Sequence, residues 1–283
     1  MVVIPLEVEH LMNDTNLDQV CREIRRLTLE SIYSIGKGHV GGCMSIVEVL
    51  AVLYYRVMNV DPADPKMPGR DRLVVSKGHA GPAVYAALAS RGYFPREELL
   101  TLNRTGTNLP SHCDMNKTPG IDMTTGSLGQ GFSCAVGVAI GSELAGDGAT
   151  VYTIIGDGES QEGQVWEAAM YAAHRGLSNL IAFTDCNRMQ IDGMVDEVCS
   201  LGDLDAKWRA FGWYVQRVNG HDCNAIYEAI QNAKRREGQP SMILLDTIKG
   251  YGVQFAIDAG VGCHSMSVTK EQYEAAIGGL SGR

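Results

Sequence analysis

Apolar positions follow two different periods along this chain, and the second half shows the clearest order. Short, nearly continuous apolar runs are typical of strands buried on both faces, and runs with an apolar residue every three or four positions are typical of helices. Strands are expected at 72–76, 150–155, 180–185, 213–218 and 241–246. Helices are expected between them, near 164–175, 204–211 and 224–237. This alternation predicts an α/β fold: a doubly wound, mostly parallel sheet with helices on both faces.

The first half is predicted to be mainly helical. A glycine-rich loop at 36–42 follows the first helix, and Ser45 and Glu48 fit a capping box that opens the next one. The segment 103–125 has little periodicity and is expected to be irregular. The expected helices cover 16–35, Ser45 to near Asn59, an alanine-rich stretch to Ser90, 95–102, a small-residue stretch from 131 to Ala145, and 269–277.

Composition limits the classes of protein to which the chain can belong. Its 283 residues show no repeat, linker or low-complexity tract, so one domain over residues 1–283 is expected. A net charge of −9 without a basic stripe argues against nucleic acid as a partner. The N-terminus lacks the features of a signal peptide, and the longest apolar runs are too short to span a membrane. Eight cysteines without a CxxC pair favour reduced, buried thiols, and the cytoplasm is the expected location.

A glycine–aspartate–glycine turn is the most informative local pattern. Gly156-Asp157-Gly158 directly follows one predicted strand, and Asn187 follows the next strand along the chain. Because parallel strands end at the same edge of a sheet, Asp157 and Asn187 are expected to converge. Carboxylate and carboxamide oxygens suit Mg²⁺ or Ca²⁺, and the glycines let backbone amides approach an anion. This pattern predicts a site for a metal-bound diphosphate.

Four of the seven histidines lie in glycine- or proline-containing loops, which are suitable places for proton transfer near neutral pH. A single loop histidine is usually an ordinary surface or capping residue, but four beside a diphosphate turn favour a catalytic role. They are His39, His79, His112 and His264. The other three, His10, His174 and His221, are interpreted as structural. His221 precedes a predicted helix, where capping and turn formation explain it.

Two further features leave alternatives open. The loop Gly126–Gly131 could bind phosphate, although it lacks the P-loop lysine, or its glycines could allow tight helix packing. Glu162 and Glu167 follow the diphosphate turn and could equally be solvated glutamates on a helix.

Together these motifs resemble the N-terminal half of transketolase, the diphosphate-binding domain of a thiamine diphosphate enzyme. Gly156-Asp157-Gly158 with Asn187 marks the wider superfamily of such enzymes. The loops Ser76-Lys77-Gly78-His79, Gly126–Gly131 and Lys249-Gly250-Tyr251-Gly252 make the resemblance specific to transketolase, and it covers nearly the whole chain.

The resemblance implies a ligand set and a proton-transfer set. Mg²⁺ (or Ca²⁺) would be held by Asp157, Asn187 and the backbone carbonyl of Met189, and Gly158 would donate its amide to the diphosphate. His39 and His264 would move protons on substrate hydroxyls, and His112 would bind the donor's terminal hydroxyl. The residues implied at the cofactor are His79, Gly126, Ser127, Leu128, Gly158, Glu159, Asn187, Ile191 and His264.

The resemblance also implies an activity and partners. In this family the cofactor acts as an electron sink while a two-carbon ketol group moves from a ketose to an aldose. Glu162 and Glu167 match glutamates that link two cofactor sites across a dimer interface. The pyrimidine-binding domain of the family lies outside the matched region, so a separate partner subunit is expected to supply it in an α2β2 assembly. Sugars or sugar phosphates are the expected substrates.

Two alternatives remain from the sequence. The α subunit of a 2-oxo acid dehydrogenase shares Gly156-Asp157-Gly158 and Asn187, but that alternative does not explain the loops of His39 and His79. A non-catalytic interaction subunit would bind no cofactor even with its partner present.

Overall fold

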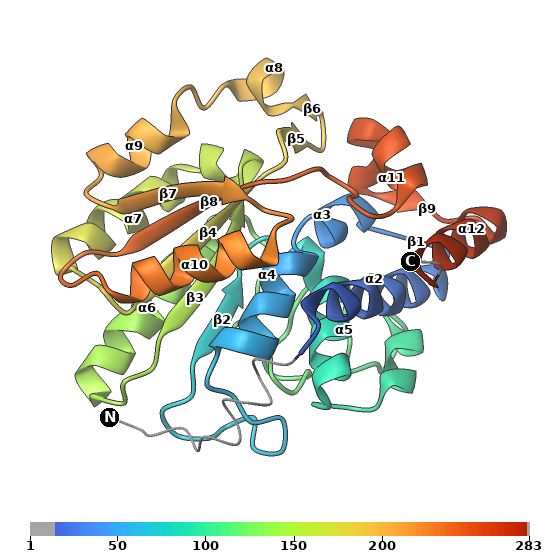
Figure 1. The fold of residues 1–283 in the computed structure, drawn as a ribbon, viewed down its shortest axis with the longest axis horizontal. Helices are drawn as coiled ribbons and strands as arrows, with labels where there is room; N and C mark the ends of the chain where they lie inside the picture. Colours follow the sequence, from blue (N-terminus) through green and yellow to red (C-terminus); the bar gives the residue numbers. More distant parts are fainter. Residues whose placement is uncertain (1–14, 282–283) are drawn as a thin grey trace.

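The computed structural model describes residues 15–281, which form a parallel sheet between two layers of helices (Figure 1). The five strands of the sheet are β2 (Arg72–Val75), β3 (Val151–Gly156), β4 (Leu180–Cys186), β7 (Tyr214–Asn219) and β8 (Ser241–Asp246). They lie in the order β2-β3-β4-β8-β7, and every neighbouring pair is parallel. The predicted α/β class, the positions of the strands and the parallel sheet are therefore confirmed.

Alternate residues of each strand pack into two separate cores. Tyr152, Ile154, Ile181 and Phe183 face one helical layer, whose helices pack around α2. That layer consists of α2 (Leu17–Tyr33), α4 (Val47–Val52), α5 (Gly81–Arg91) and α10 (Cys223–Lys234). Val151, Ile155, Leu180 and Ala182 face the other layer. Its helices are α6 (Gln130–Ala145), α7 (Gly163–Arg175) and α9 (Leu204–Ala210). Strands with both faces buried explain why the sequence reads as continuous apolar runs.

Short helices and strands near the edge of the sheet adjoin the loops that form the candidate active site described below. They are β1 (Lys37–Gly38), α3 (Val40–Met44), β5 (Met189–Gln190), β6 (Gly193–Met194), α8 (Val195–Cys199), α11 (Gln254–Asp258) and β9 (Met266–Ser267). The helix α12 (Lys270–Ser281) packs on α2. Short helical turns complete the set: a π-helical turn at Leu53–Val57 and 3₁₀ turns at Gly78–Ala80, Arg96–Thr101, Gly158–Gln161 and Gly260–His264.

The structure corrects three local predictions. The glycine-rich segment 36–42 is not only a loop, because it contains β1 and the start of α3. The capping box at Ser45 is wrong: Ile46 precedes α4, and the Ser45 hydroxyl donates to the Asp185 carboxylate at 2.6 Å. Short polar side chains often serve as caps, but a buried carboxylate is a stronger acceptor. Two cysteines, Cys134 and Cys199, are exposed rather than buried, and none of the eight forms a disulfide.

Other predictions for the first half hold. Residues 103–125 contain no helix or strand, and α2 lies within the helix expected at 16–35. Among residues 15–281, none of the helices combines the length and apolarity needed to cross a bilayer.

Candidate active site

A cavity of about 320 Å³ lies where the loops after β2, β3, β4 and β8 come together. Parallel sheets bind ligands at this edge, where the carboxyl ends of the strands open. Nearly all the residues that the sequence singled out line it. They are His39, His79, His112, Gly126, Leu128, Asp157, Gly158, Glu159, Asn187, Met189, Ile191 and His264.

The four loop histidines form one cluster on this cavity. The ring of His39 lies 5.3 Å from His79, 5.8 Å from His112 and 5.4 Å from His264, measured between ring centroids. His79 and His264 are 4.9 Å apart. Residues separated by up to 225 positions in the sequence are thus brought together, which no single motif could establish.

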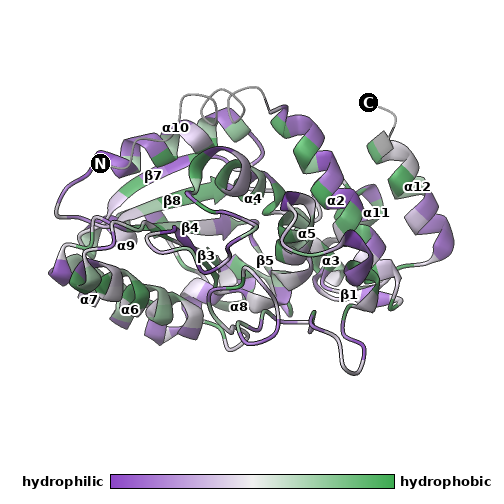
Figure 2. Cartoon of the chain, turned by 90° about the horizontal axis from the view of Figure 1, so that it is seen from below, coloured by the Kyte–Doolittle hydropathy of each residue, from purple (hydrophilic) through white to green (hydrophobic). Residues whose placement is uncertain are grey.

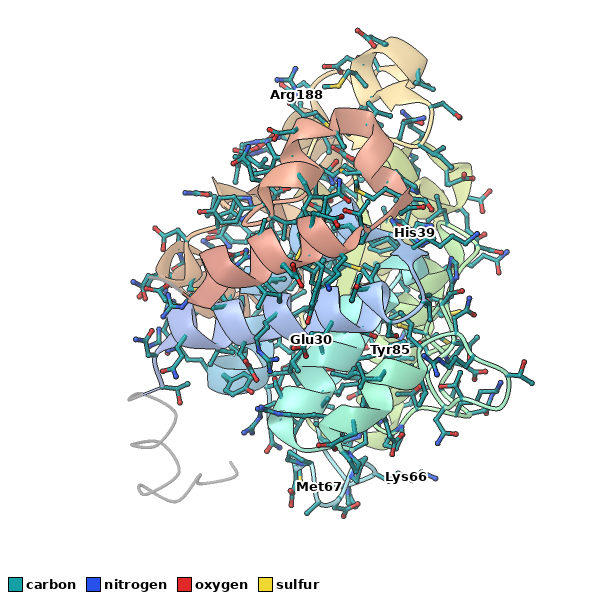
Figure 3. The ribbon with its side chains drawn as sticks, turned by 90° about the vertical axis from the view of Figure 1, so that its right-hand side faces the viewer. Glu30, His39, Lys66, Met67, Tyr85 and Arg188 are labelled. Carbon is teal, nitrogen blue, oxygen red and sulfur yellow. The ribbon has the colours of Figure 1, made fainter. Side chains whose placement is uncertain are left out.

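Backbone contacts bring the histidine loops together. β1 pairs antiparallel with β9, with Lys37 opposite Ser267, so His39 and His264 lie on neighbouring segments. The Tyr85 hydroxyl lies 3.1 Å from the carbonyl of His112 and secures that loop to α5. Figure 3 labels Tyr85 on α5, below His39. Both contacts are tertiary and leave no local pattern in the sequence.

Burial and neighbouring cations keep the histidines neutral. Desolvation, with smaller contributions from Lys249 and His39, lowers the pKa of His264 to about 4. Burial also lowers the pKa of His79 well below its ordinary value, with Lys77 adding to the effect. The pKa values of His39 and His112 are lowered mainly by burial. Neutral imidazoles can accept protons, so the cluster suits proton transfer from hydroxyl groups.

The three predicted metal-binding residues also lie on the cavity. Asp157 and Asn187 are 5% and 9% exposed. One carboxylate oxygen of Asp157 accepts from the amide of Gly158 at 2.8 Å, and the other accepts from the amide of Arg188. Asn187 donates its side-chain N–H to Asp185 at 2.8 Å, and its side-chain oxygen accepts from the amide of Met189 at 3.1 Å.

These residues fit a hard divalent cation. Burial, with the nearby charge of Asp185, raises the pKa of Asp157 to about 7, and the buried Lys77 pairs with Asp185 instead. No cationic side chain of residues 15–281 forms an ion pair with Asp157, so a bound cation would stabilise its ionised form. The side-chain oxygen of Gln190, also on the cavity, is buried and without a hydrogen-bond partner. Residues 15–281 hold no group of three His, Cys, Asp or Glu ligands, so a cation here requires amide and backbone oxygens.

Three further polar residues line the cavity, although no individual role was predicted for them: Lys77, Asp185 and Lys249. Asp185, fully buried, accepts hydrogen bonds from Lys77 at 2.6 Å and from the Thr247 hydroxyl. The ammonium of Lys249 donates to the carbonyl of Met189 at 3.0 Å and lies 3.2 Å from His264. The position of Lys77 and Lys249 shortly after apolar strands was a usable signal in the sequence, since a lysine that becomes buried there needs a partner.

Some predicted residues lie differently from expectation. Ser127 is exposed and is not among the residues that line the cavity. Glu159 lines it, but its carboxylate accepts from Ser76, from the amide of Gly129 at 2.8 Å and from the amide of Gly156 at 3.0 Å. Glu159 thus joins the loop Gly126–Gly131 to the diphosphate turn.

The glycines of that loop also serve helix packing. A Cβ atom on Gly131 would lie 2.7 Å from the Cα of Ser76, so only glycine lets α6 approach the end of β2 this closely. The packing explanation therefore holds for Gly131, and Gly126 and Leu128 are the loop residues on the cavity.

The histidines interpreted as structural differ in surroundings. His174 is exposed in the last turn of α7, as expected. Asp222, not His221, caps α10, and the buried His221 ring contacts Glu48. His10 lies outside the described residues. Glu162 and Glu167 are both exposed, and Glu162 reaches the cavity.

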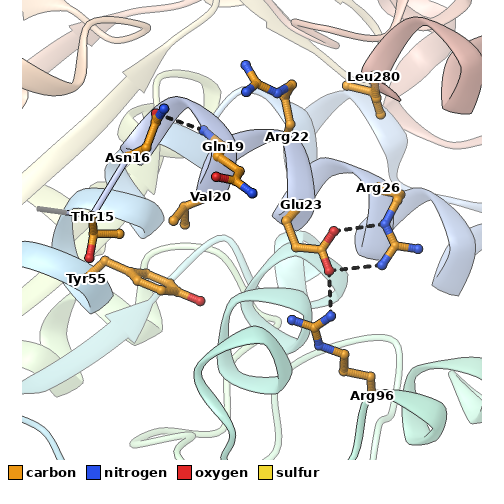
Figure 4. Close-up of a pocket in the computed structure, with 10 residues that line it drawn as sticks. All are labelled: Thr15, Asn16, Gln19, Val20, Arg22, Glu23, Arg26, Tyr55, Arg96 and Leu280. Atoms are coloured by element: carbon orange, nitrogen blue, oxygen red, sulfur yellow. Dashed lines mark hydrogen bonds and ion pairs between the residues drawn. The ribbon is translucent and has the colours of Figure 1, made fainter. Parts of the chain in front are cut away.

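A larger hollow of about 710 Å³ lies beside α2, away from the histidines (Figure 4). Glu23 lies at its centre and bonds to Arg26 at 2.9 Å and to Arg96 at 2.7 Å. Arg26 also pairs with Glu30, so two carboxylates balance the charges of the two arginines. The smaller cavity, with its titratable cluster, is therefore the candidate active site.

Comparison with known proteins identifies the family. Residues 17–276 match the family model described as transketolase, thiamine diphosphate binding domain. The 6-deoxy-6-sulfo-D-fructose transketolase subunit SqwG of Clostridium sp. (strain MSTE9) is 58% identical over 265 residues, which cover 94% of this chain and 96% of that protein. One of the subunits of the apulose-4-phosphate transketolase of Phocaeicola vulgatus is 38% identical over 259 residues, which cover 92% of each chain.

This chain also resembles solved structures of transketolases. Transketolase from Leishmania mexicana superimposes with a TM-score of 0.88 at 30% identity, over 94% of this chain. The matched region is 41% of that transketolase, so this chain spans about two-fifths of the longer enzymes.

The chain belongs to the transketolase family and corresponds to its N-terminal, thiamine diphosphate-binding domain. The expected class of enzyme, a transferase, is confirmed by these relatives.

The lowered histidine pKa values predict acid sensitivity of the fold. His264 takes up a proton only near pH 4 when folded, but near its ordinary 6.5 when unfolded. The unfolded state therefore binds more protons between these values, and the free energy of unfolding should fall as the pH drops from 6.5 to 4. Urea unfolding at several pH values should show a shallower fall for His264→Asn. The exposed His174→Asn serves as control, and identical pH dependence in wild type and His264→Asn would contradict the assignment.

Proposed function

We propose that this chain is one subunit of a two-component transketolase, which transfers a two-carbon ketol group from a ketose to an aldose. The observation that carries the proposal is the convergence of Asp157, Asn187 and four neutral histidines on one cavity. Thiamine diphosphate, with Mg²⁺ or Ca²⁺, would occupy this cavity. Residues 1–283 would act as one diphosphate-binding domain, and the cytoplasm remains the location expected from the sequence.

The metal and the cofactor would be held by different parts of the cavity. Asp157, Asn187 and the carbonyl of Met189 offer oxygen ligands that suit a hard cation. The remaining cofactor contacts would come from His79, Gly126, Ser127, Leu128, Gly158, Glu159, Ile191 and His264. When bound, the cofactor supplies an electron sink for cleavage of a carbon–carbon bond.

The histidines would handle the protons of the reaction. His39 and His264 would accept a proton from a donor hydroxyl and return one to the acceptor, and His112 would bind the donor's terminal hydroxyl. Their lowered pKa values support this role, because an imidazole must be neutral to act as a base.

The names of two relatives indicate which sugars to test as substrates. One is named for 6-deoxy-6-sulfo-D-fructose and another for apulose-4-phosphate, so both are named for anionic sugars outside the ordinary pentose phosphates. The 58% identity to the former makes 6-deoxy-6-sulfo-D-fructose the first donor to test, ahead of a pentose phosphate.

The proposed assembly is two copies of this chain with two copies of a pyrimidine-domain subunit. An apolar surface on α6 and α7 supports self-association, with Leu144, Met170 and Tyr171 81%, 60% and 49% exposed. Figure 2 shows apolar residues, in green, along both helices. Glu167 lies on α7, consistent with the expected place of Glu162 and Glu167 at a dimer interface.

The site favours this function over its alternatives. A 2-oxo acid dehydrogenase subunit would explain Asp157 and Asn187 but leaves the four-histidine cluster without a role. A non-catalytic subunit would have no need for desolvated histidines beside a buried carboxyl group with a raised pKa.

Reconstitution tests the proposed function. The chain alone should be nearly inactive, and mixing it with a pyrimidine-domain partner should give ketol transfer from 6-deoxy-6-sulfo-D-fructose to an aldose phosphate. The reconstituted complex should not decarboxylate pyruvate with ferricyanide as oxidant. Pyruvate turnover would instead favour the dehydrogenase alternative. A complex that binds no cofactor would favour the non-catalytic one.

A charge on the apolar surface should prevent self-association. Met170→Asp and Leu144→Asp place a carboxylate where the proposed interface buries apolar area, so sedimentation analysis should show a shift toward monomer. Leu100→Asp, at a residue 48% exposed on another surface, is the matched control and should leave the mass unchanged. If both interface variants keep the wild-type mass, α6 and α7 do not form the interface.

A further inference from the structure

The ring of Tyr251, in the segment 248–252, contacts the side chains of His221 and Arg25. The ring stacks on His221 with 3.6 Å between ring centroids and 16° between planes. On another side the guanidinium of Arg25 lies 5.1 Å from the ring centroid, and its Nε donates to the Tyr251 carbonyl at 3.0 Å. Both the side chain and the backbone of this residue are therefore fixed.

Glu48 joins these two side chains. It accepts from Arg25 through one oxygen and from Nδ1 of His221, at 3.2 Å, through the other. Nε2 of His221 in turn accepts from the amide of Ile248 at 2.8 Å. Because Nε2 is an acceptor, the proton of a neutral His221 ring lies on Nδ1 and points to Glu48.

This network is too buried to serve only as a surface turn. The side chains of Arg25, Glu48 and His221 are 6%, 5% and 7% exposed. Buried charged groups are costly unless each is paired, so the network persists only with all members in place. A Cβ atom on Gly252 would lie 2.6 Å from Nε of Arg25, so glycine is needed there for Arg25 to reach Tyr251.

The fixed segment carries a residue of the candidate active site. Lys249 lies between the two anchored residues, Ile248 and Tyr251, and is 4% exposed. Its ammonium contacts the carbonyl of Met189, a predicted metal ligand, and the ring of His264. The amide of Gly250 also donates to the carbonyl of Gly41, in α3 directly after His39, at 3.2 Å.

We propose that Arg25, Glu48 and His221 are positioning residues: they fix the segment 248–252 so that the Lys249 ammonium is held between Met189 and His264. The importance of this placement for catalysis rests on the proposed function, whereas the placement itself can be tested without cofactor.

Protection of Lys249 from chemical labelling provides the test. The full-length chain is treated with acetic anhydride under native conditions, and acetylation of each lysine is followed by mass spectrometry. His221→Phe keeps an aromatic ring but loses both hydrogen bonds, so Lys249 should label about ten- to a hundredfold faster. Lys77, 2% exposed and paired with Asp185, should stay protected in the same sample.

Two further variants separate positioning from general destabilisation. His221→Gln keeps an acceptor for the Ile248 amide and should restore part of the protection. Trp213→Phe removes a buried hydrogen bond to Ala169 in the other core and should change neither lysine. The proposal is overturned if Lys249 labels at the wild-type rate in both His221 variants, or if Lys77 labels faster in parallel.

The same variants distinguish this proposal from the proposed function. Thiamine diphosphate and Mg²⁺ are titrated into the reconstituted wild-type complex and the reconstituted His221→Phe complex. A wild type that binds neither, with Lys249 still exposed by His221→Phe, contradicts the proposed function alone. A wild type that binds both, with Lys249 protected in every variant, contradicts the positioning role alone.

Discussion

The candidate site depends on the hydrogen bonds that four side chains donate to the buried carboxylate of Asp185. The donors come from four different segments: Lys77 after β2, Ser45 after α3, Thr247 after β8 and Asn187 after β4, the strand of Asp185 itself. Burial alone would raise the pKa of Asp185, but Lys77 and the hydroxyl donors hold it below its ordinary value. Removing one partner of such a buried pair costs about 3–5 kcal/mol, because the other charge is left buried and unpaired.

This constraint explains how two neighbouring carboxylates serve different purposes. Asp185 has a full set of donors, and one of them is the carboxamide N–H of Asn187, a residue on the cavity. Asp157 accepts from two backbone amides and forms no ion pair with a side chain of the described residues, so its carboxyl group remains available to a cation on the cavity wall. The histidine cluster opposite stays neutral because it is desolvated and lies near Lys77 and Lys249. The cavity thus combines a carboxylate suited to a cation with bases suited to proton transfer.

The sequence predicted the sheet well, since strands buried on both faces leave continuous apolar runs. Most of the residues that it singled out also line one cavity, because the loops at strand ends carry chemically distinctive side chains. It could not predict the pairing of β1 with β9, the bond from Ser45 to Asp185 or the burial of His221 against Glu48. These contacts join residues far apart in the sequence, and the local pattern at Ser45 and His221 favoured an ordinary cap or turn.

The central claim is that Asp157 and Asn187 jointly hold a cation against the diphosphate of the cofactor. Calorimetric titration of the reconstituted complex with thiamine diphosphate and Mg²⁺ tests it most directly, with Asp157→Ala compared with the exposed Asp196→Ala. We expect wild type and Asp196→Ala to retain the cofactor and Asp157→Ala to lose it. Equal retention by all three proteins would contradict the claim.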